Sequence, residues 1–234
     1  MTRLLAFATL FALTLTACDT VEPEPVDLTV RTAADVAADP ATRDPNTGQV
    51  RGTDRYTLFS LRTGEVVVGY DDAERADSAS TLWDIGFRGT EVIVNGGASG
   101  PGSAAAVVVA QPFAEVTDAV GPNVVYREDG SATCPLVQTP VGPVPGRSLA
   151  VCTGSGNGWY TYTPFPTGGG YILPTPGRTL LVRLADGSGY AKVRFLSYYR
   201  GNPAPSAITP ASEDRYYTFE FVTNDQGSSF VDEG

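Results

Sequence analysis

Histidine is absent from this chain of 234 residues, and its only methionine is Met1. Without histidine, the chain lacks the usual general base of enzymes at neutral pH and the commonest nitrogen ligand for metal ions. A Gly-x-Ser-x-Gly nucleophile elbow and a phosphate-binding loop are missing as well. We therefore expect a protein that is not an enzyme and that has no metal site.

Lysine is nearly absent, since Lys192 is the only one and every other basic residue is arginine. The 16 basic residues are outnumbered by 26 acidic residues, which gives a formal net charge of −10. Nucleic-acid binding depends on Lys and Arg side chains that neutralise phosphates. The charge balance therefore argues against a nucleic-acid partner.

The apolar run near the N-terminus, Leu4 to Leu15, is too short for a permanent membrane helix. It follows Arg3, as in a secretory signal peptide. The next residues, Leu15-Thr16-Ala17-Cys18, resemble the lipobox of bacterial lipoproteins, in which the cysteine is acylated and becomes the new N-terminus. We expect residues 1–17 to be a lipoprotein signal peptide and acylated Cys18 to anchor the chain to a membrane. The alternative is an ordinary signal peptide that is cut elsewhere.

Residues 18–54 have the composition of a flexible tether that follows the acylated cysteine. Glu22-Pro23-Glu24-Pro25 is acidic and rich in proline, which favours an extended, solvated segment. Ala33–Ala41 is compatible with one or two short helical turns, limited by Pro40. We expect the folded domain to comprise residues 55–234.

No segment keeps a helical period of 3.6 residues for more than about two turns. By contrast, Trp83, Ile85 and Phe87 alternate with Asp84 and Gly86, which predicts a core strand with three bulky side chains on one buried face. The other expected strands are Tyr56–Leu61, Glu65–Tyr70, Glu91–Val94, Thr179–Leu184, Tyr190–Leu196 and Tyr216–Val222, with Ala104–Ala110 a buried strand or a short helix. The sequence predicts an all-β protein with little helix, a single antiparallel β-sandwich or barrel-like domain.

Only two cysteines, Cys134 and Cys152, remain after the one in the lipobox. In an exported chain, two cysteines most simply form one disulfide. A free pair and a metal site are the alternatives, although two thiols without histidine are too few ligands for a typical metal site.

Three pairs of adjacent carboxylates, Asp71-Asp72, Glu128-Asp129 and Glu213-Asp214, are the remaining candidates for chemistry. Such pairs in strands or loops are usually solvated, and less often bind calcium. We expect these six side chains to lie on the surface.

Several motifs in the same order resemble the HmuY-like family of bacterial surface lipoproteins. They are Trp83–Phe87, Asn95–Gly100, Trp159–Tyr162 with Ile172–Pro174, Tyr190–Tyr199 and Arg215–Val222. The resemblance implies a mostly antiparallel β fold and a lipoprotein of the cell envelope, in the outer membrane or at the cell surface. It also implies a protein that takes haem from host or environmental haemoproteins and passes it to an outer-membrane receptor.

The resemblance does not extend to the haem ligands. Founding members of the family hold the haem iron between two histidines, and some relatives use methionine, whereas this chain has no histidine and no methionine after Met1. Tyrosinate can also ligate ferric haem, so Tyr171, with Tyr160 or Tyr162 as the second ligand, is the candidate set for haem or another ligand. The alternative is that these tyrosines are core or rim aromatics. The chain would then be a lipoprotein that binds a different ligand or a protein partner.

Overall fold

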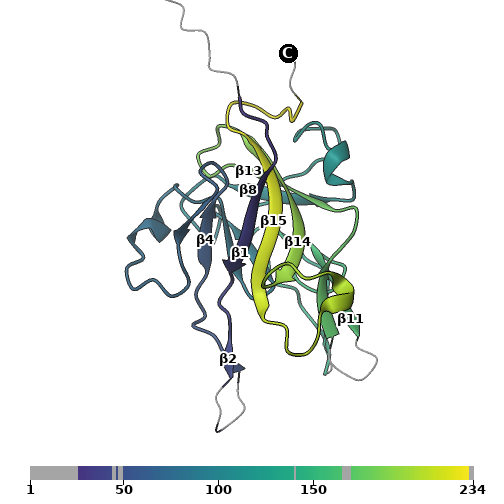
Figure 1. Ribbon diagram of the computed structural model, residues 1–234. Coiled ribbons are helices and arrows are strands. Elements are labelled where there is room, and N and C mark those ends of the chain that lie inside the picture. Colours follow the sequence, from purple (N-terminus) through teal and green to yellow (C-terminus); the bar gives the residue numbers. More distant parts are fainter. Residues whose placement is uncertain (1–25, 44–45, 47–49, 140, 165–169, 232–234) are drawn as a thin grey trace, which may run out of the picture.

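Two antiparallel β-sheets packed face to face form the body of the protein (Figure 1). The computed structural model describes residues 26–43, 46, 50–139, 141–164 and 170–231. The larger sheet has the order β1 (Arg31–Ala37), β15 (Asp214–Asn224), β14 (Tyr190–Tyr199), β13 (Thr179–Arg183) and β8 (Ala105–Val109). The smaller sheet has the order β5 (Glu65–Val68), β4 (Thr57–Ser60), β6 (Ile85–Arg88) and β7 (Glu91–Val94).

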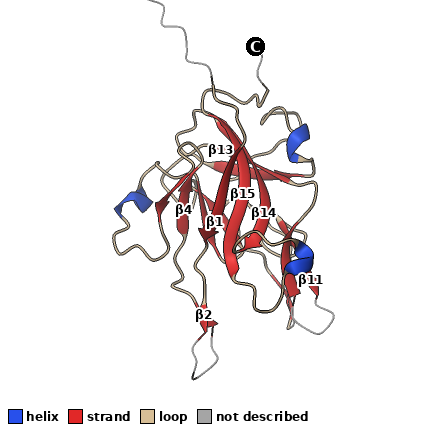
Figure 2. Cartoon of the chain, viewed as in Figure 1, coloured by secondary structure: helices blue, strands red, loops and turns tan. Residues whose placement is uncertain are grey.

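Three small hairpins and three short 3-10 helices complete the described chain (Figure 2). The hairpins are β2 (Thr42–Arg43) with β3 (Val50–Arg51), β9 (Val137–Thr139) with β10 (Gly142–Val144), and β11 (Tyr160–Pro164) with β12 (Gly170–Pro174). The 3-10 helices are η1 (Ala76–Ala79), η2 (Phe113–Glu115) and η3 (Pro205–Ala207). The prediction of an all-β sandwich with little helix is confirmed.

Aromatic side chains from both sheets fill the core between them. Phe59 of β4 meets Phe219 of β15 with ring centroids 5.2 Å apart, and Phe87 of β6 meets Tyr217 of β15 at 4.7 Å. All four rings are buried, and each fully buried aromatic side chain stabilises the fold by roughly 1.5–3 kcal/mol. The strands expected over Tyr190–Leu196 and Tyr216–Val222 are confirmed as parts of β14 and β15.

The expected helical turns within Ala33–Ala41 are wrong. Arg31–Ala37 is strand β1, which pairs with β15 from Arg31 opposite Phe221 to Ala37 opposite Tyr216. The helix propensity of alanine is outweighed by sheet hydrogen bonds and by burial of Ala33 and Val36 in the core. The sheet therefore begins inside the segment predicted as a flexible tether.

The expectation that Trp83, Ile85 and Phe87 share one buried face is also wrong, although all three are buried. Ile85 and Phe87 face the larger sheet, but Trp83 lies before β6 and packs on the other side of the smaller sheet, in a cluster with Leu58, Val68, Ile93 and Leu149. The chain bends at Asp84, whose carboxylate accepts hydrogen bonds from the backbone N–H groups of Leu61 (2.8 Å) and Ala185 (2.9 Å). Because of this bend, the Trp83 side chain does not follow the alternation of β6.

The expectation that all six paired carboxylates lie on the surface is wrong for Asp129, which is only 2% exposed. Its carboxylate accepts hydrogen bonds from the backbone N–H groups of Val94 (3.0 Å) and Ala150 (2.7 Å). Burial raises the pKa of Asp129, and these hydrogen bonds oppose that rise. Asp129 therefore joins β7 to the segment that carries the second cysteine.

Cys134 and Cys152 form a disulfide, with Cα atoms 5.4 Å apart, as predicted. The bond closes the irregular segment that contains β9 and β10. Within the described ranges, no group of three or more His, Cys, Asp or Glu side chains is placed to hold a metal ion.

The described chain starts at one end of the sandwich, and the β11–β12 hairpin lies at the other end (Figure 1). The register agrees, since β1 starts opposite Phe221, whereas the last residue of β14, Tyr199, pairs with Asp214 at the far end of β15. Cys18 and the predicted signal peptide lie outside the described residues. No helix in the part of the chain that the structure covers is long and apolar enough to cross a membrane.

Candidate functional site

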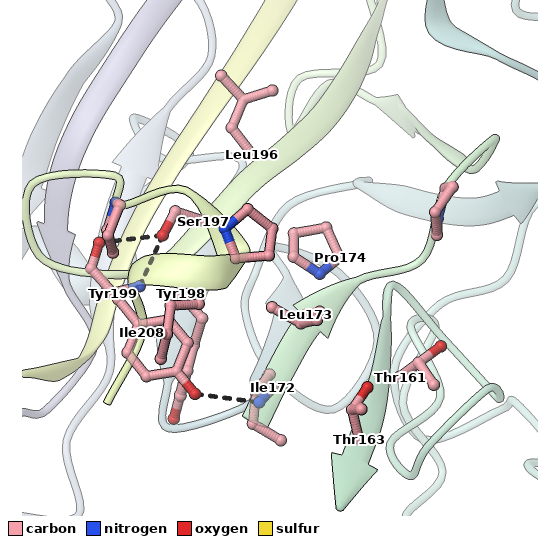
Figure 3. Close-up of a pocket in the computed structure, with 13 residues that line it drawn as sticks. Thr161, Thr163, Ile172, Leu173, Pro174, Leu196, Ser197, Tyr198, Tyr199 and Ile208 are labelled. Carbon is pink, nitrogen blue, oxygen red and sulfur yellow. Dashed lines mark hydrogen bonds between the residues drawn. The ribbon is translucent and has the colours of Figure 1, made fainter. Parts of the chain in front are cut away.

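A cavity of about 360 Å³ lies between the β11–β12 hairpin, the last residues of β14 and the η3 segment, which comprises η3 and its flanking residues 203–208 (Figure 3). Its walls are mostly apolar and contain four prolines. The lining residues are Thr161, Thr163, Ile172, Leu173, Pro174, Pro176, Leu196, Ser197, Tyr198, Tyr199, Pro203, Pro205 and Ile208. Its volume is at the low end of the roughly 300–1,000 Å³ range of small-molecule sites.

A local irregularity at the end of β14 forms one wall of this cavity. The pairing of β14 with β15 shifts register on both sides of Ser197. The Ser197 hydroxyl accepts a hydrogen bond from the Tyr199 N–H (2.9 Å) and donates one to the Tyr199 carbonyl oxygen (3.1 Å) (Figure 3). Such bulges redirect side chains, and here Ser197, Tyr198 and Tyr199 are all buried in succession instead of alternating.

Tyr198 connects the cavity to the aromatic core. Its ring contacts Trp159 at 5.9 Å and Tyr217 at 5.5 Å between centroids. Burial raises the pKa of Tyr198, and the negative charge of Asp214 raises it further. The phenol therefore stays protonated at neutral pH.

Tyr199 holds the hairpin against the end of the larger sheet. Its hydroxyl accepts a hydrogen bond from the Ile172 N–H at 3.1 Å (Figure 3). A second tyrosine acts in the same region, because the Tyr171 hydroxyl donates to the Ile208 carbonyl oxygen at 2.8 Å. These two bonds fasten β12 to β14 and to the η3 segment, and so fix the width of the cavity.

The three tyrosines predicted as ligands do not converge on one point. Tyr171 lies directly opposite Thr163 in the hairpin, while Tyr162 lies opposite Ile172, one position further along. Directly opposed residues project from the same face of a strand pair, and successive residues from opposite faces. Tyr171 therefore projects from one face of the hairpin and Tyr160 and Tyr162 from the other.

Their environments differ as well. Tyr160 is buried, and its hydroxyl accepts a hydrogen bond from the Gly154 N–H at 3.0 Å. Tyr162 is 46% exposed. None of the three predicted tyrosines lines the cavity, whereas Tyr198 and Tyr199 do. The sequence offered one signal for the latter two, which is a pair of tyrosines where the alternation of β14 breaks down.

The cavity does not offer the donors that haem iron usually takes. Its lining contains no histidine, methionine or cysteine, so only hydroxyl and backbone groups are present as polar atoms. The Ser197 and Tyr199 hydroxyls are hydrogen-bonded to the protein, and the Thr161 hydroxyl is bonded to that of Thr175 at 2.9 Å. The residues fit an apolar ligand and do not fit a protein-ligated iron.

A second, polar cleft of about 650 Å³ includes Arg88, Arg215, Asp39 and Glu91 in its lining. Arg88 and Glu91 form an ion pair at 2.7 Å, and Arg215 donates to the Asp39 carbonyl oxygen at 2.9 Å. The lining of this cleft holds three arginines and three carboxylates, so the cleft presents little net charge to a ligand. The apolar cavity is the better candidate site.

Fold and cavity together define an all-β sandwich protein with an apolar cavity at one end of its larger sheet. The chain belongs to the HmuY family, because the family's sequence model, described as HmuY protein, matches residues 52–221. The crystal structure of a Tannerella forsythia apo HmuY analog is 14% identical in sequence, with 84% of this chain and 95% of that chain covered and a TM-score of 0.40. No curated protein matches the chain.

Proposed function

We propose that this protein is a lipid-anchored binding protein of the bacterial cell envelope that holds the flat, apolar ring of haem or a porphyrin in the cavity beside β12 and β14. The observation that carries the proposal is the cavity itself, whose walls are apolar side chains and prolines. A mostly apolar concave site with few polar groups is typical of small-molecule binding. Membership of the HmuY family supports haem or porphyrin as the ligand.

The proposed anchor is Cys18, acylated after removal of residues 1–17. Two or more acyl chains suffice for stable membrane attachment, whereas one chain is marginal. The described chain starts at the end of the sandwich opposite the β11–β12 hairpin (Figure 1). The anchor and the cavity would then lie at opposite ends of the domain, which leaves the cavity accessible to an incoming ligand or to an outer-membrane receptor.

The test is a titration of haemin into the chain from Asp19 to Gly234, which contains every residue that the structure describes, followed by absorbance. A saturable shift of the Soret band is expected. Leu196→Glu, which places a charge in the cavity wall, should weaken binding by about tenfold or more, since a buried unpaired charge costs several kcal/mol.

The matched control is Leu82→Glu, because Leu82 is 59% exposed and is not part of the cavity. This variant should bind haemin as tightly as the parent chain. Absence of any saturable shift in the parent chain, or equal binding by the two glutamate variants, would remove the proposed function.

A further inference from the structure

We infer that this cavity recognises the tetrapyrrole ring and not the iron, so that metal-free porphyrin is bound as tightly as haemin. This inference rests on the proposed function and deepens it by naming the ligand class. The site would accept the flat, apolar ring of a tetrapyrrole whether or not that ring carries a metal ion.

The donor atoms that haem iron usually takes from a protein are scarce in this chain. The chain has no histidine, and its only methionine is Met1, in the predicted signal peptide. Cys134 and Cys152 are bonded to each other, so neither offers a thiolate. The nitrogen and sulfur ligands that proteins use for haem iron are therefore missing from the folded domain.

The tyrosine hydroxyls near the cavity are poorly suited to ligate iron. A tyrosine must lose its proton to ligate ferric iron, and burial raises the pKa of both Tyr198 and Tyr199, which opposes this loss. The Tyr199 hydroxyl also accepts the Ile172 N–H, and the Tyr171 hydroxyl donates to the Ile208 carbonyl oxygen. Ligation by Tyr199 or Tyr171 would disturb the bonds that hold the hairpin in place.

The cavity offers apolar walls in place of iron ligands. Leu173, Leu196 and Ile208 supply aliphatic surface, and four prolines supply apolar walls with few conformations to lose on binding. A flat aromatic ring gains from contact with such walls by burying its apolar surface, and this gain does not depend on the atom at its centre. The recognition energy would therefore be the same for the metal-free ring.

The experiment compares haemin with metal-free protoporphyrin on the same chain from Asp19 to Gly234. Haemin binding is followed by absorbance and porphyrin binding by its own fluorescence. The two dissociation constants are expected to agree within about threefold, and each ring should displace the other competitively. Leu196→Glu should weaken both by the same factor, while Leu82→Glu should weaken neither.

Tyrosine variants test whether any tyrosine near the cavity ligates the haem iron. Tyr171→Phe, Tyr198→Phe and Tyr199→Phe should each leave the Soret maximum of bound haemin unchanged, and circular dichroism of each variant should show that the fold is retained. A shifted Soret maximum in one folded tyrosine variant that still binds metal-free protoporphyrin as tightly as the parent chain would identify that residue as an iron ligand and overturn the inference.

The outcomes also separate the inference from the proposed function. Haemin binding that is more than about tenfold tighter than porphyrin binding would overturn the inference and leave the proposed function standing. Failure of both rings to bind would overturn the two together.

Discussion

The hydroxyl of Tyr199 accepts a hydrogen bond from the backbone N–H of Ile172 at 3.1 Å, which joins the last residue of β14 to the middle of β12. The bulge at Ser197 is what brings Tyr199 to this position, since it breaks the alternation of β14 just before the strand ends. One side chain thus links an irregularity in the larger sheet to the hairpin that covers the cavity.

Tyr199→Phe should therefore loosen the hairpin. The change leaves the Ile172 N–H without its acceptor, and an unsatisfied, partly buried donor costs about 1–3 kcal/mol. Urea unfolding should show a loss of about 1 kcal/mol, and amide exchange at Ile172 should speed up. Tyr162→Phe, at a half-exposed position of the same hairpin, is the control and should change neither quantity.

Asp84→Asn and Asp129→Asn should each destabilise the fold by about 2–3 kcal/mol, since hydrogen bonds to a charged group are the strong ones. Each carboxylate accepts two backbone N–H groups from separate segments. An asparagine can accept only one of them and turns its NH₂ group toward the other. Asp71→Asn, at an exposed position, should lower the free energy of unfolding by less than about 0.5 kcal/mol. Equal effects of all three changes would contradict this account.

Glu91 should make stability depend on pH. Burial acts to raise its pKa, but hydrogen bonds from Tyr56, Arg147 and Arg88 outweigh burial and leave the pKa below its usual value of 4.5. A carboxyl whose folded pKa is lowered adds stability above its unfolded pKa, and this stability is lost as the pH falls through the folded value. Glu91→Gln should lower the free energy of unfolding by about 1–2 kcal/mol at pH 7. The loss is modest because Arg147 is partly exposed, so that water and salt screen its charge.

The difference between Glu91→Gln and the parent chain should shrink as the pH falls below 4.5, where the carboxyl of the parent chain takes up its proton. Urea unfolding at pH 7, 5 and 3 measures it. Glu65→Gln, at an exposed position, is the control and should follow the parent chain at every pH. A difference that grew toward acid would have the wrong sign for this explanation.

Reduction of the disulfide, or the double change Cys134→Ser with Cys152→Ser, should lower the free energy of unfolding by about 3 kcal/mol. The two cysteines are 18 positions apart, and the bond limits the freedom of that loop in the unfolded chain. Denaturant unfolding with and without reductant measures the effect on the parent chain. The double variant should not respond to reductant.

Lys192, the only lysine of the chain, should resist amine reagents in the folded protein. The residue is 6% exposed, and its Nζ donates to the carbonyl oxygens of Phe113 (3.1 Å) and Val116 (2.7 Å). Burial lowers the pKa of Lys192, yet the closed surroundings keep reagents out. Peptide mass spectrometry should find slow acylation of Lys192 in buffer and rapid acylation in denaturant. Rapid labelling in buffer would mean that the η2 segment opens readily.

The class of fold, most of the strands and the disulfide could be predicted from local features of the sequence. The alternation of apolar residues along β14 and β15 is local, and a period of two leaves a strand only one way to bury its apolar face. Cys134 and Cys152 are the only cysteines in the domain that we propose is exported, so only one disulfide can form within it.

The first strand, the buried aspartates and the residues around the cavity depend on contacts between segments that are distant in the sequence. Arg31 to Ala37, rich in alanine and with one aspartate, favours no strand on its own, and β1 forms because β15 offers an edge to pair with. The burial of Asp129 and the bend at Asp84 depend on N–H groups that come from distant segments. Tyr171 and Tyr162 project from opposite faces because of hairpin register, and Tyr199 turns inward because of a bulge. Register, bulges and distant hydrogen-bond donors are relations between segments, and a reading of one segment at a time does not contain them.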